Sequence, residues 1–125
     1  MAADGMTYAP KGKPNRVVEA GEFKFAAVAL DHGHINGMCN GLTEAGAELS
    51  WVYDANEEKA AALASQFAGA KVASSLEQVL DDQEVQLVAA AAIPNLRGPL
   101  GCQVMDAGKD YFTDKCPFTT LDQLD

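Results

Sequence analysis

The end of the chain carries the residues best suited to chemistry. The run Tyr111-Phe112-Thr113 has the apolar and aromatic character of a strand, and Asp114 and Lys115 follow it at once. In open α/β sheets, ligands bind beyond the carboxyl ends of the strands. A lysine there can transfer a proton, orient a hydroxyl group or hold an anion. Lys115 is therefore the candidate catalytic residue, with Asp114 beside it, and a surface ion pair between the two is the alternative.

A second candidate site lies in the turn after the first apolar run. The turn leads into a helical pattern, and free N–H groups at the start of a helix attract phosphate. The candidate cofactor-binding residues of this turn are His32, Gly33, His34 and Ile35. The glycine fingerprint of dinucleotide sites is missing, because only Gly33 remains and Ala29 stands near the place of its first glycine. Two turn histidines without a ligand are the alternative, and no third ligand stands nearby to suggest a metal site.

Two further turns follow apolar runs. Asp54 ends the second run, about 20 residues after the first turn, where an acidic side chain binds the ribose hydroxyls of NAD and repels the 2′-phosphate of NADP. An ordinary helix N-cap is the alternative for Asp54. Pro94 and Asn95 follow the fourth run, and the amide of Asn95 can donate and accept hydrogen bonds. Arg97, the one basic residue of that loop, faces either a cofactor or substrate group or the solvent.

The elements that must position these turns alternate regularly. Apolar runs of strand length occupy residues 25–30, 49–53, 71–73, 85–93 and 111–113. Helical spacing of apolar residues or capping signals occupies residues 35–45, 56–69, 75–80 and 99–107. Pro99 fits the first turn of the last helix. This alternation predicts a parallel sheet with helices on both faces, a Rossmann-like, doubly wound α/β fold of three layers that is incomplete at its C-terminus.

The composition limits the possible functions. A chain of 125 residues with 48% apolar residues fits one globular domain, and no apolar run approaches the roughly 20 residues of a membrane span. The net charge of −9 opposes binding to nucleic acid or to anionic membranes. Three cysteines without metal-ligand spacing predict reduced thiols in a cytoplasmic protein. Cys39 and Cys102 are expected in the core, and Cys116 is the only one considered for function.

The two ends of the chain differ from its middle. Residues 1–24 contain glycine and proline without a periodic pattern or a signal peptide, so they form an N-terminal extension before a domain at 25–125. The segment Thr120-Leu121-Asp122-Gln123 is a capping box and predicts the start of a helix. A single turn is not stable alone, so we expect a longer native chain that continues past Asp125.

Together these motifs resemble the N-terminal domain of the glucose-fructose oxidoreductase, inositol dehydrogenase and rhizopine-catabolism family (Gfo/Idh/MocA). The resemblance covers residues 25–125, and the motifs that carry it are Asp54, Ile93-Pro94-Asn95, Gly108-Lys109-Asp110-Tyr111-Phe112 and Asp114-Lys115-Cys116-Pro117. It implies a Rossmann domain that binds NAD(P), and the position of Asp54 favours NAD over NADP. It also implies an oxidoreductase that acts on a sugar, polyol or related hydroxyl compound.

The resemblance also implies roles for single residues. Lys115 resembles the lysine of the family's Glu-Lys-Pro motif, which contacts the nicotinamide side and assists catalysis, and Asp114 resembles its acidic partner. Asp54 resembles the ribose ligand, and Asn95 the asparagine of the family's Pro-Asn loop. This sequence departs from the family in its glycine loop, in Asp114 for glutamate, in Cys116 between the lysine and the proline, and in Gly98 for a histidine.

The family's second α/β domain, which supplies the substrate pocket, an acid/base group and the usual oligomer interface, is absent from these 125 residues. We therefore expect little turnover by this segment alone. A non-catalytic nucleotide-binding or regulatory module is the alternative, because the glycine loop is altered. A flavodoxin- or receiver-like domain has less support, since Asp31 alone does not supply the acidic cluster of a receiver.

Overall fold

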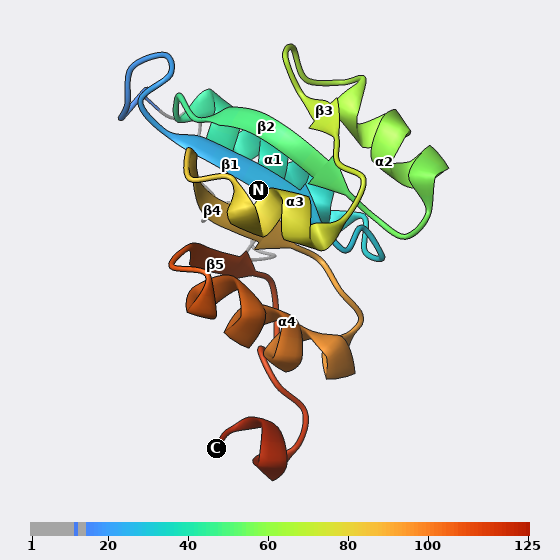
Figure 1. Cartoon of the computed structure of the whole chain (residues 1–125). Helices are drawn as coiled ribbons and strands as arrows, with labels where there is room; N and C mark the ends of the chain where they lie inside the picture. The colour runs from blue at the N-terminus through green and yellow to red at the C-terminus, as the bar shows by residue number, and fades with distance from the viewer. Residues whose placement is uncertain (1–11, 13–14) are drawn as a thin grey trace, which may run out of the picture.

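A computed structural model describes residue 12 and residues 15–125 of the chain. These residues form one parallel five-stranded sheet in the order β3-β2-β1-β4-β5, with helices on both faces (Figure 1). The strands are β1 (Lys24–Val28), β2 (Glu48–Tyr53), β3 (Lys71–Val72), β4 (Val85–Ala90) and β5 (Asp110–Thr113). The helices are α1 (His34–Glu44), α2 (Glu57–Ala64), α3 (Leu76–Asp81), α4 (Pro94–Asp106) and a 3₁₀ turn, η2 (Leu121–Gln123). The predicted Rossmann-like fold is confirmed.

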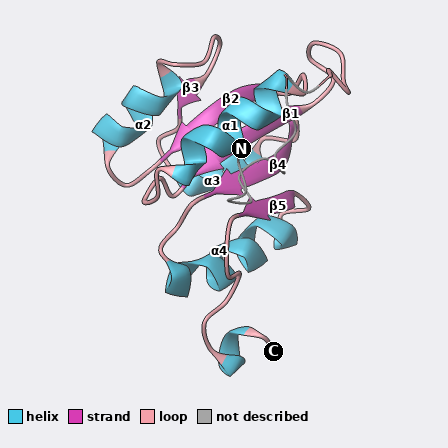
Figure 2. Ribbon diagram, turned by 180° about the vertical axis from the view of Figure 1, so that it is seen from behind, coloured by secondary structure: helices cyan, strands magenta, loops and turns pink. Residues whose placement is uncertain are grey.

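Alternate residues of β1 supply two separate cores, one on each face of the sheet. Phe25 and Ala27 pack with α1 and α2 on the face seen in Figure 2, whereas Ala26 and Val28 pack with α3 and α4 on the face seen in Figure 1. All four side chains are almost fully buried. A strand buried on both faces needs a continuous apolar run, which is the pattern that the sequence shows.

Two helices begin at the residues that their capping signals indicate. The side chain of Asn56 accepts the N–H groups of Glu58 and Lys59, and that of Ser75 accepts the N–H group of Gln78. These bonds satisfy N–H groups that a helix leaves free at its start. The turns after β2 and β3 are therefore fixed at the points where the chain leaves the sheet.

Helix α4 corrects one expectation. It begins at Pro94 rather than near Pro99, and β4 ends at Ala90. Pro94 takes the first helical position, where its fixed φ and missing N–H are harmless. Pro99 lies inside the helix and has no N–H group to donate to Asn95 four residues earlier. The side chain of Gln123 donates to the carbonyl oxygen of Asn95 instead, at 2.8 Å.

Cys102 was expected in the core, and this is wrong: it is exposed on α4, as is Cys116 in the segment after β5, whereas Cys39 is buried as predicted. The buried side of α4 is set by Arg97, Gly101 and Val104, at helical spacings of four and three. Cys102 follows Gly101 by one position and therefore faces outward.

The remaining differences concern the ends of elements. Helix α2 ends at Ala64 rather than Gly69, because the chain tightens into turns with bonds between residues three apart. The helix expected at Thr120 is a 3₁₀ turn in which the Thr120 side chain makes no cap, while Gln123 accepts the N–H of Thr119 at 2.9 Å.

Most of the expected N-terminal extension lies outside the described residues. Its described part lies against the end of α1, since the N–H of Val17 donates to the carbonyl oxygen of Ala45 at 2.8 Å. Among the helices that the structure describes, none combines the length and apolar character needed to span a bilayer.

Candidate functional site

The turns singled out in the sequence lie along the carboxyl edge of the sheet. Hydrogen bonds join them across the strands. The N–H of Leu30, after β1, donates to Oδ2 of Asp54, after β2, at 2.7 Å. The N–H of His32 donates to the carbonyl oxygen of Ala91, after β4, at 3.0 Å. The edge is therefore a connected rim, because the carboxyl ends of parallel strands meet on one side.

A hollow of about 300 Å³ opens in this rim between the ends of β1 and β2 and the helices α3 and α4. Its lining is mostly apolar and consists of Val28, Ala29, Asp31, Tyr53, Asp54, Ala55, Leu76, Leu96 and Leu100. The three leucines were not singled out in the sequence. The sequence gives little indication that they line a site, because leucines near a helix start usually belong to the core. Such a hollow can hold a flat apolar group with a polar group at its mouth.

Asp54 is held firmly at the mouth of this hollow. Its Oδ2 accepts the N–H of Leu30, and its Oδ1 accepts the N–H of Asn56 at 2.8 Å. The helix N-cap is Asn56, so the interpretation of Asp54 as an ordinary N-cap is wrong. A carboxylate has about four acceptor positions, and two backbone bonds leave room for hydroxyl donors. The geometry fits a side chain that orients a diol.

The turn before α1 has two features that a phosphate-binding loop also uses. Ala29 has φ +52°, the left-handed conformation that glycine adopts most easily. The N-cap of α1 is Gly33, which supplies no side-chain cap, and the positive end of the helix dipole favours an anion here. Two N–H groups of this first turn are already engaged, since Ile35 and Asn36 donate to the carbonyl oxygens of His32 and Gly33 at 3.2 Å. These features fit a pyrophosphate at this helix start.

The residues of this turn do not all face one way. His32, Gly33 and Ile35 line a separate hollow of about 270 Å³ that also includes Lys59 of α2. The Ile35 side chain is 3% exposed and packs in the core. Any contribution of Ile35 to binding is therefore limited to its backbone. The ring of His34 lies 4.9 Å from that of His32, between centroids, and contacts Asp114 beyond β5.

The side chains of His34, Arg97 and Asp114 form a polar cluster at the end of β5. Nδ1 of His34 contacts Oδ2 of Asp114, and Nη2 of Arg97 lies 3.9 Å from Oδ1 of Asp114. Burial disfavours the charged form of Asp114, but the hydrogen bond and charge of His34 and the charge of Arg97 outweigh burial and hold the pKa of Asp114 below its usual range. Oδ1 of Asp114 is buried and has no hydrogen-bond partner among the described residues.

Arg97 differs from both interpretations made from the sequence. It lies in the first turns of α4 rather than in a loop, and it is 2% exposed, so it does not face the solvent. Its Nε donates to the carbonyl oxygen of Ala92 at 2.8 Å, and its Nη1 donates to that of Cys116 at 3.2 Å. Its guanidinium therefore binds this chain's own backbone.

Lys115 follows this cluster and is exposed, with φ +61°. A left-handed backbone at a non-glycine residue is costly and tends to occur at functional sites. Pro94 and Asn95 are exposed at the start of α4, on the same rim. The expected residues therefore fall into three groups: Asp54 at the apolar hollow, His32 and Gly33 at α1, and His34, Arg97, Asp114 and Lys115 after β5.

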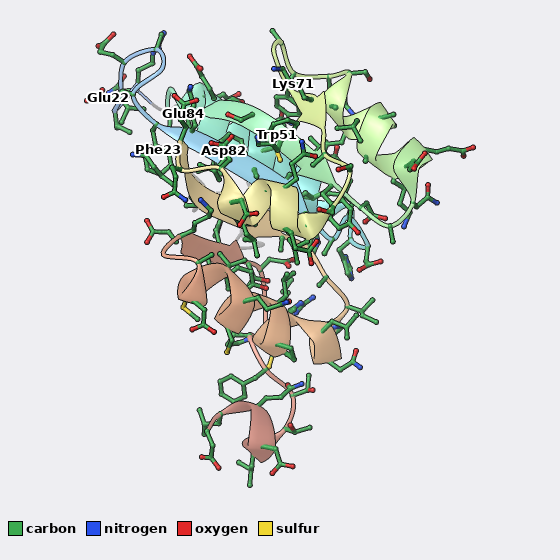
Figure 3. The ribbon with its side chains drawn as sticks, in the orientation of Figure 1. Glu22, Phe23, Trp51, Lys71, Asp82 and Glu84 are labelled. Carbon is green, nitrogen blue, oxygen red and sulfur yellow. The ribbon has the colours of Figure 1, made fainter. Side chains whose placement is uncertain are left out.

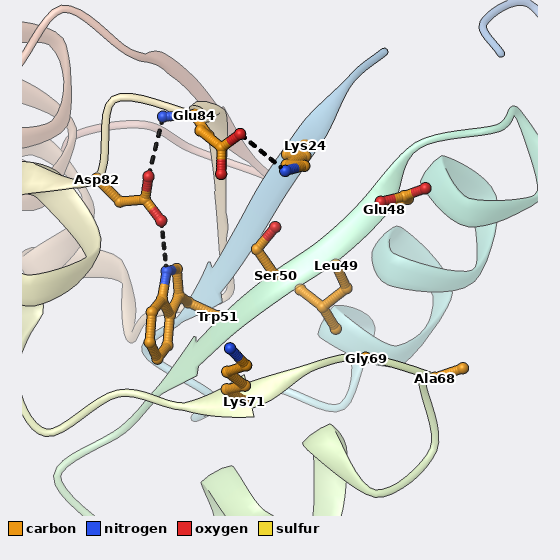
Figure 4. Close-up of a pocket in the computed structure, with 10 residues that line it drawn as sticks. All are labelled: Lys24, Glu48, Leu49, Ser50, Trp51, Ala68, Gly69, Lys71, Asp82 and Glu84. Atoms are coloured by element: carbon orange, nitrogen blue, oxygen red, sulfur yellow. Dashed lines mark hydrogen bonds and ion pairs between the residues drawn. The ribbon is translucent and has the colours of Figure 1, made fainter. Parts of the chain in front are cut away.

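A third hollow, which is polar and has a volume of about 230 Å³, lies at the opposite, amino edge of the sheet (Figures 3 and 4). Lys24 pairs with Glu84 there at 3.0 Å. The indole Nε1 of Trp51 donates to Asp82 at 2.7 Å. Lys71 lies over the Trp51 ring, with Nζ 5.8 Å from its centroid. These charged and aromatic groups are engaged with one another, so we place the functional site at the carboxyl edge.

Within the described part of the chain, no cluster of three or more acidic, cysteine or histidine side chains is arranged to hold a metal.

Comparison with known proteins identifies the family to which this fold belongs. The family described as an oxidoreductase family with an NAD-binding Rossmann fold, Gfo/Idh/MocA, matches residues 26–125. No curated protein matches the sequence.

Several solved structures share the fold. A protein from Erwinia carotovora atroseptica, described as an oxidoreductase, is 44% identical with a TM-score of 0.76, and the match covers 82% of this chain and 31% of that chain. GenD2 from gentamicin A biosynthesis, solved with NAD, is 26% identical with a TM-score of 0.75, covering 92% of this chain and 32% of that one.

The myo-inositol dehydrogenase of Lactobacillus casei, solved with NAD(H) and myo-inositol, is 25% identical with a TM-score of 0.72. That match covers 81% of this chain and 30% of the dehydrogenase, so this chain spans less than a third of that relative. The family match extends over nearly all of the described strands and helices. The chain belongs to the Gfo/Idh/MocA family of oxidoreductases and corresponds to its NAD-binding Rossmann domain.

Proposed function

We propose that this chain binds NAD along the carboxyl edge of its sheet and serves an oxidoreductase acting on a sugar, polyol or related hydroxyl compound. The adenosine end would lie in the apolar hollow, with the ribose hydroxyls on Asp54. The pyrophosphate would lie at the start of α1. The nicotinamide would lie toward Asn95 and Lys115, where NAD supplies hydride-transfer chemistry when bound.

The observation that carries this proposal is the placement of Asp54. Two backbone N–H groups fix its carboxylate at the mouth of the hollow, so ribose can bind without reordering the side chain. A fixed negative charge here also disfavours the 2′-phosphate of NADP. We therefore propose NAD as the preferred cofactor.

The relatives support the class of substrate. Two of them were solved with NAD or NAD(H), and one of these also holds myo-inositol, a polyol. The substrate of this protein and any oligomer would depend on regions of such relatives that this chain does not match. We propose Lys115 as the catalytic residue of this domain, and Asn95 and Asp114 as its neighbours at the nicotinamide end.

A test compares NAD and NADP binding by calorimetry in the natural sequence, in Asp54→Asn and in Glu58→Gln. Glu58 is an exposed acid of α2 and controls for the loss of one charge. We expect tighter binding of NAD than of NADP, and a loss of about tenfold or more in NAD affinity for Asp54→Asn only, since a hydrogen bond to a charged group contributes about 1.5–3 kcal/mol. Equal binding of the two cofactors would contradict the role of Asp54.

A second comparison separates binding from chemistry. Asp54→Ala should weaken NAD binding more than Lys115→Ala does, because the first residue is proposed to bind ribose and the second to act on the reacting end. The reverse order would show that Lys115 is mainly a binding residue.

The alternative of a nucleotide-binding module without chemistry has its support in the altered glycine loop. The left-handed conformation of Ala29 weakens that support, because the backbone turns as a glycine would turn it. Both alternatives bind a nucleotide, and they differ only in the role of Lys115.

A further inference from the structure

The arginine inside α4 holds the residues on both sides of Lys115. Arg97 has a side chain that is 3% exposed, and it reaches from α4 to the segment after β5. Its Nη1 donates to the carbonyl oxygen of Cys116 at 3.2 Å, and its Nη2 lies 3.9 Å from the carboxylate of Asp114. One guanidinium therefore contacts the residue before Lys115 and the residue after it.

Arg97 is itself fixed on two further sides. Its Nε donates to the carbonyl oxygen of Ala92 at 2.8 Å, just beyond the end of β4. Its own carbonyl oxygen accepts the hydroxyl of Tyr111, on β5, at 3.1 Å. The rigid, planar fork of a guanidinium holds several acceptors at fixed angles, whereas a lysine ammonium is a compact charge on a flexible stem. Arg97 thus links the end of β4 to the turn that carries Lys115.

The backbone of Lys115 needs such support. Its φ of +61° is left-handed, a conformation that lowers stability by about 1–2 kcal/mol at a residue with a side chain. Strained backbone persists only where the surrounding structure holds it. On the far side, His34 contacts Oδ2 of Asp114 and closes the same turn from α1. The described contacts therefore fix both neighbours of Lys115 and leave its side chain exposed on the rim.

We propose that Arg97 is a positioning residue for Lys115: it holds residues 114–116 in the conformation that presents the Lys115 side chain to the cofactor. Arg97 does not contact the ligand. This proposal rests on the assignment of Lys115 to the nicotinamide end, but the conformation of the turn can be tested without any ligand.

The first experiment measures the turn in the cofactor-free chain by amide NMR. The variant Arg97→Met should shift or broaden the amide signals of Lys115 and Cys116. Lys109→Met is the matched control, because Lys109 is also a buried cation, 6% exposed, bound to the carbonyl oxygens of Asp82 at 2.6 Å and Val85 at 2.9 Å. It lies at the amino edge and should leave those signals unchanged. Unmoved signals in Arg97→Met would overturn the proposal.

The second experiment is a double-mutant cycle on NAD affinity, measured by calorimetry. Arg97→Met should weaken NAD binding about threefold in the natural sequence, no more than Lys115→Ala does, and should have no further effect when Lys115→Ala is already present, because coupled residues are not additive. Equal losses in both backgrounds would show that Arg97 acts by another route and would overturn the proposal.

A second variant and the ligand-free measurement cover the cases in which Arg97→Met does not fold or NAD does not bind. If Arg97→Met does not fold, Arg97→Lys keeps a buried positive charge but cannot reach both carbonyl oxygens, so it should move the same amide signals. If the natural chain does not bind NAD, the proposed function fails, and the amide signals still decide whether Arg97 holds the turn.

Discussion

Two residues at the rim adopt backbone conformations that suit glycine. Ala29 and Lys115 have φ of +52° and +61°, and each follows a strand at the carboxyl edge. Elsewhere the described chain uses glycine for positive φ, for example at Gly46 and Gly108. This conformation lowers stability by about 1–2 kcal/mol at a residue with a side chain, and both residues lie at the edge where we place the ligand. Residue choice at these two positions is a compromise between stability and the shape of the rim.

Replacing Ala29 with glycine should test this strain. Ala29→Gly removes the left-handed penalty but adds freedom to the unfolded chain, so we expect a gain of up to about 1 kcal/mol in unfolding free energy. Ala62→Gly is the control, since Ala62 is an exposed position of α2 where glycine costs about 1 kcal/mol. Urea unfolding measures both. A comparable loss in the two variants would refute strain at Ala29.

The carboxylate of Asp114 should make the free energy of unfolding depend on pH in the acid range. Because its pKa in the folded state is lowered, its ionised form stabilises the fold above the ordinary pKa of about 3.9. That contribution disappears as the pH falls through the lower, folded-state pKa. We expect Asp114→Asn to be less stable than the natural chain at pH 6, with the difference shrinking toward pH 3. Urea unfolding across this range is the measurement, and a constant difference would show that the charge of Asp114 is unimportant.

At the scale of elements, the sequence predicted the start of a helix best where a single capping side chain fixes that start. The caps at Asn56 and Ser75 were correctly read as helix starts, since each bonds within its own turn. Helix α4 was placed too late, because two prolines competed for its start. With the helix starting at Pro94, Pro99 leaves the carbonyl oxygen of Asn95 free, and the side chain of Gln123 donates to it. That partner is 28 residues away, beyond the reach of a local pattern.

The contact between α4 and β5 can be tested at one glycine. A Cβ added at Gly101 would lie 2.5 Å from the ring of Tyr111. Gly101→Ala should therefore destabilise the chain by about 1–3 kcal/mol through overpacking. Gly41 of α1 is the control, because its added Cβ meets nothing within 4 Å and alanine favours the helix there. Thermal unfolding followed by circular dichroism compares the two, and equal effects would contradict the close packing of Gly101.

For the whole molecule, the alternation of apolar, strand-length runs with helical patterns was enough to predict a parallel sheet. Parallel strands joined by helical crossovers have few possible arrangements. The candidate site was predicted only as a set of turns. The contact of His34 with Asp114 joins residues 80 apart in the chain, and Arg97 was assigned to a loop although it is buried. Such pairings depend on how helices pack onto the sheet, which single-sequence patterns do not contain.

The three thiols should report the burial of the whole fold. Burial raises the pKa of Cys39 to about 12, whereas Cys102 and Cys116 are exposed. We expect a thiol reagent at neutral pH to label two cysteines rapidly in the folded chain and the third only on unfolding. A Cys39→Ser variant should show the two fast reactions alone. Rapid labelling of all three in the natural chain would contradict the burial of Cys39.

The chain's one tryptophan lies in the middle of β2, with its indole bonded to Asp82 and Lys71 over its ring (Figure 4). Intrinsic fluorescence therefore comes from the middle of the sheet, where β2 pairs with β1 and β3. Unfolding would break the bond of the indole to Asp82 and remove the ring from the apolar cluster that it packs against, so the emission of Trp51 should change as the fold is lost. This chain thus carries a single built-in optical reporter of its folded state.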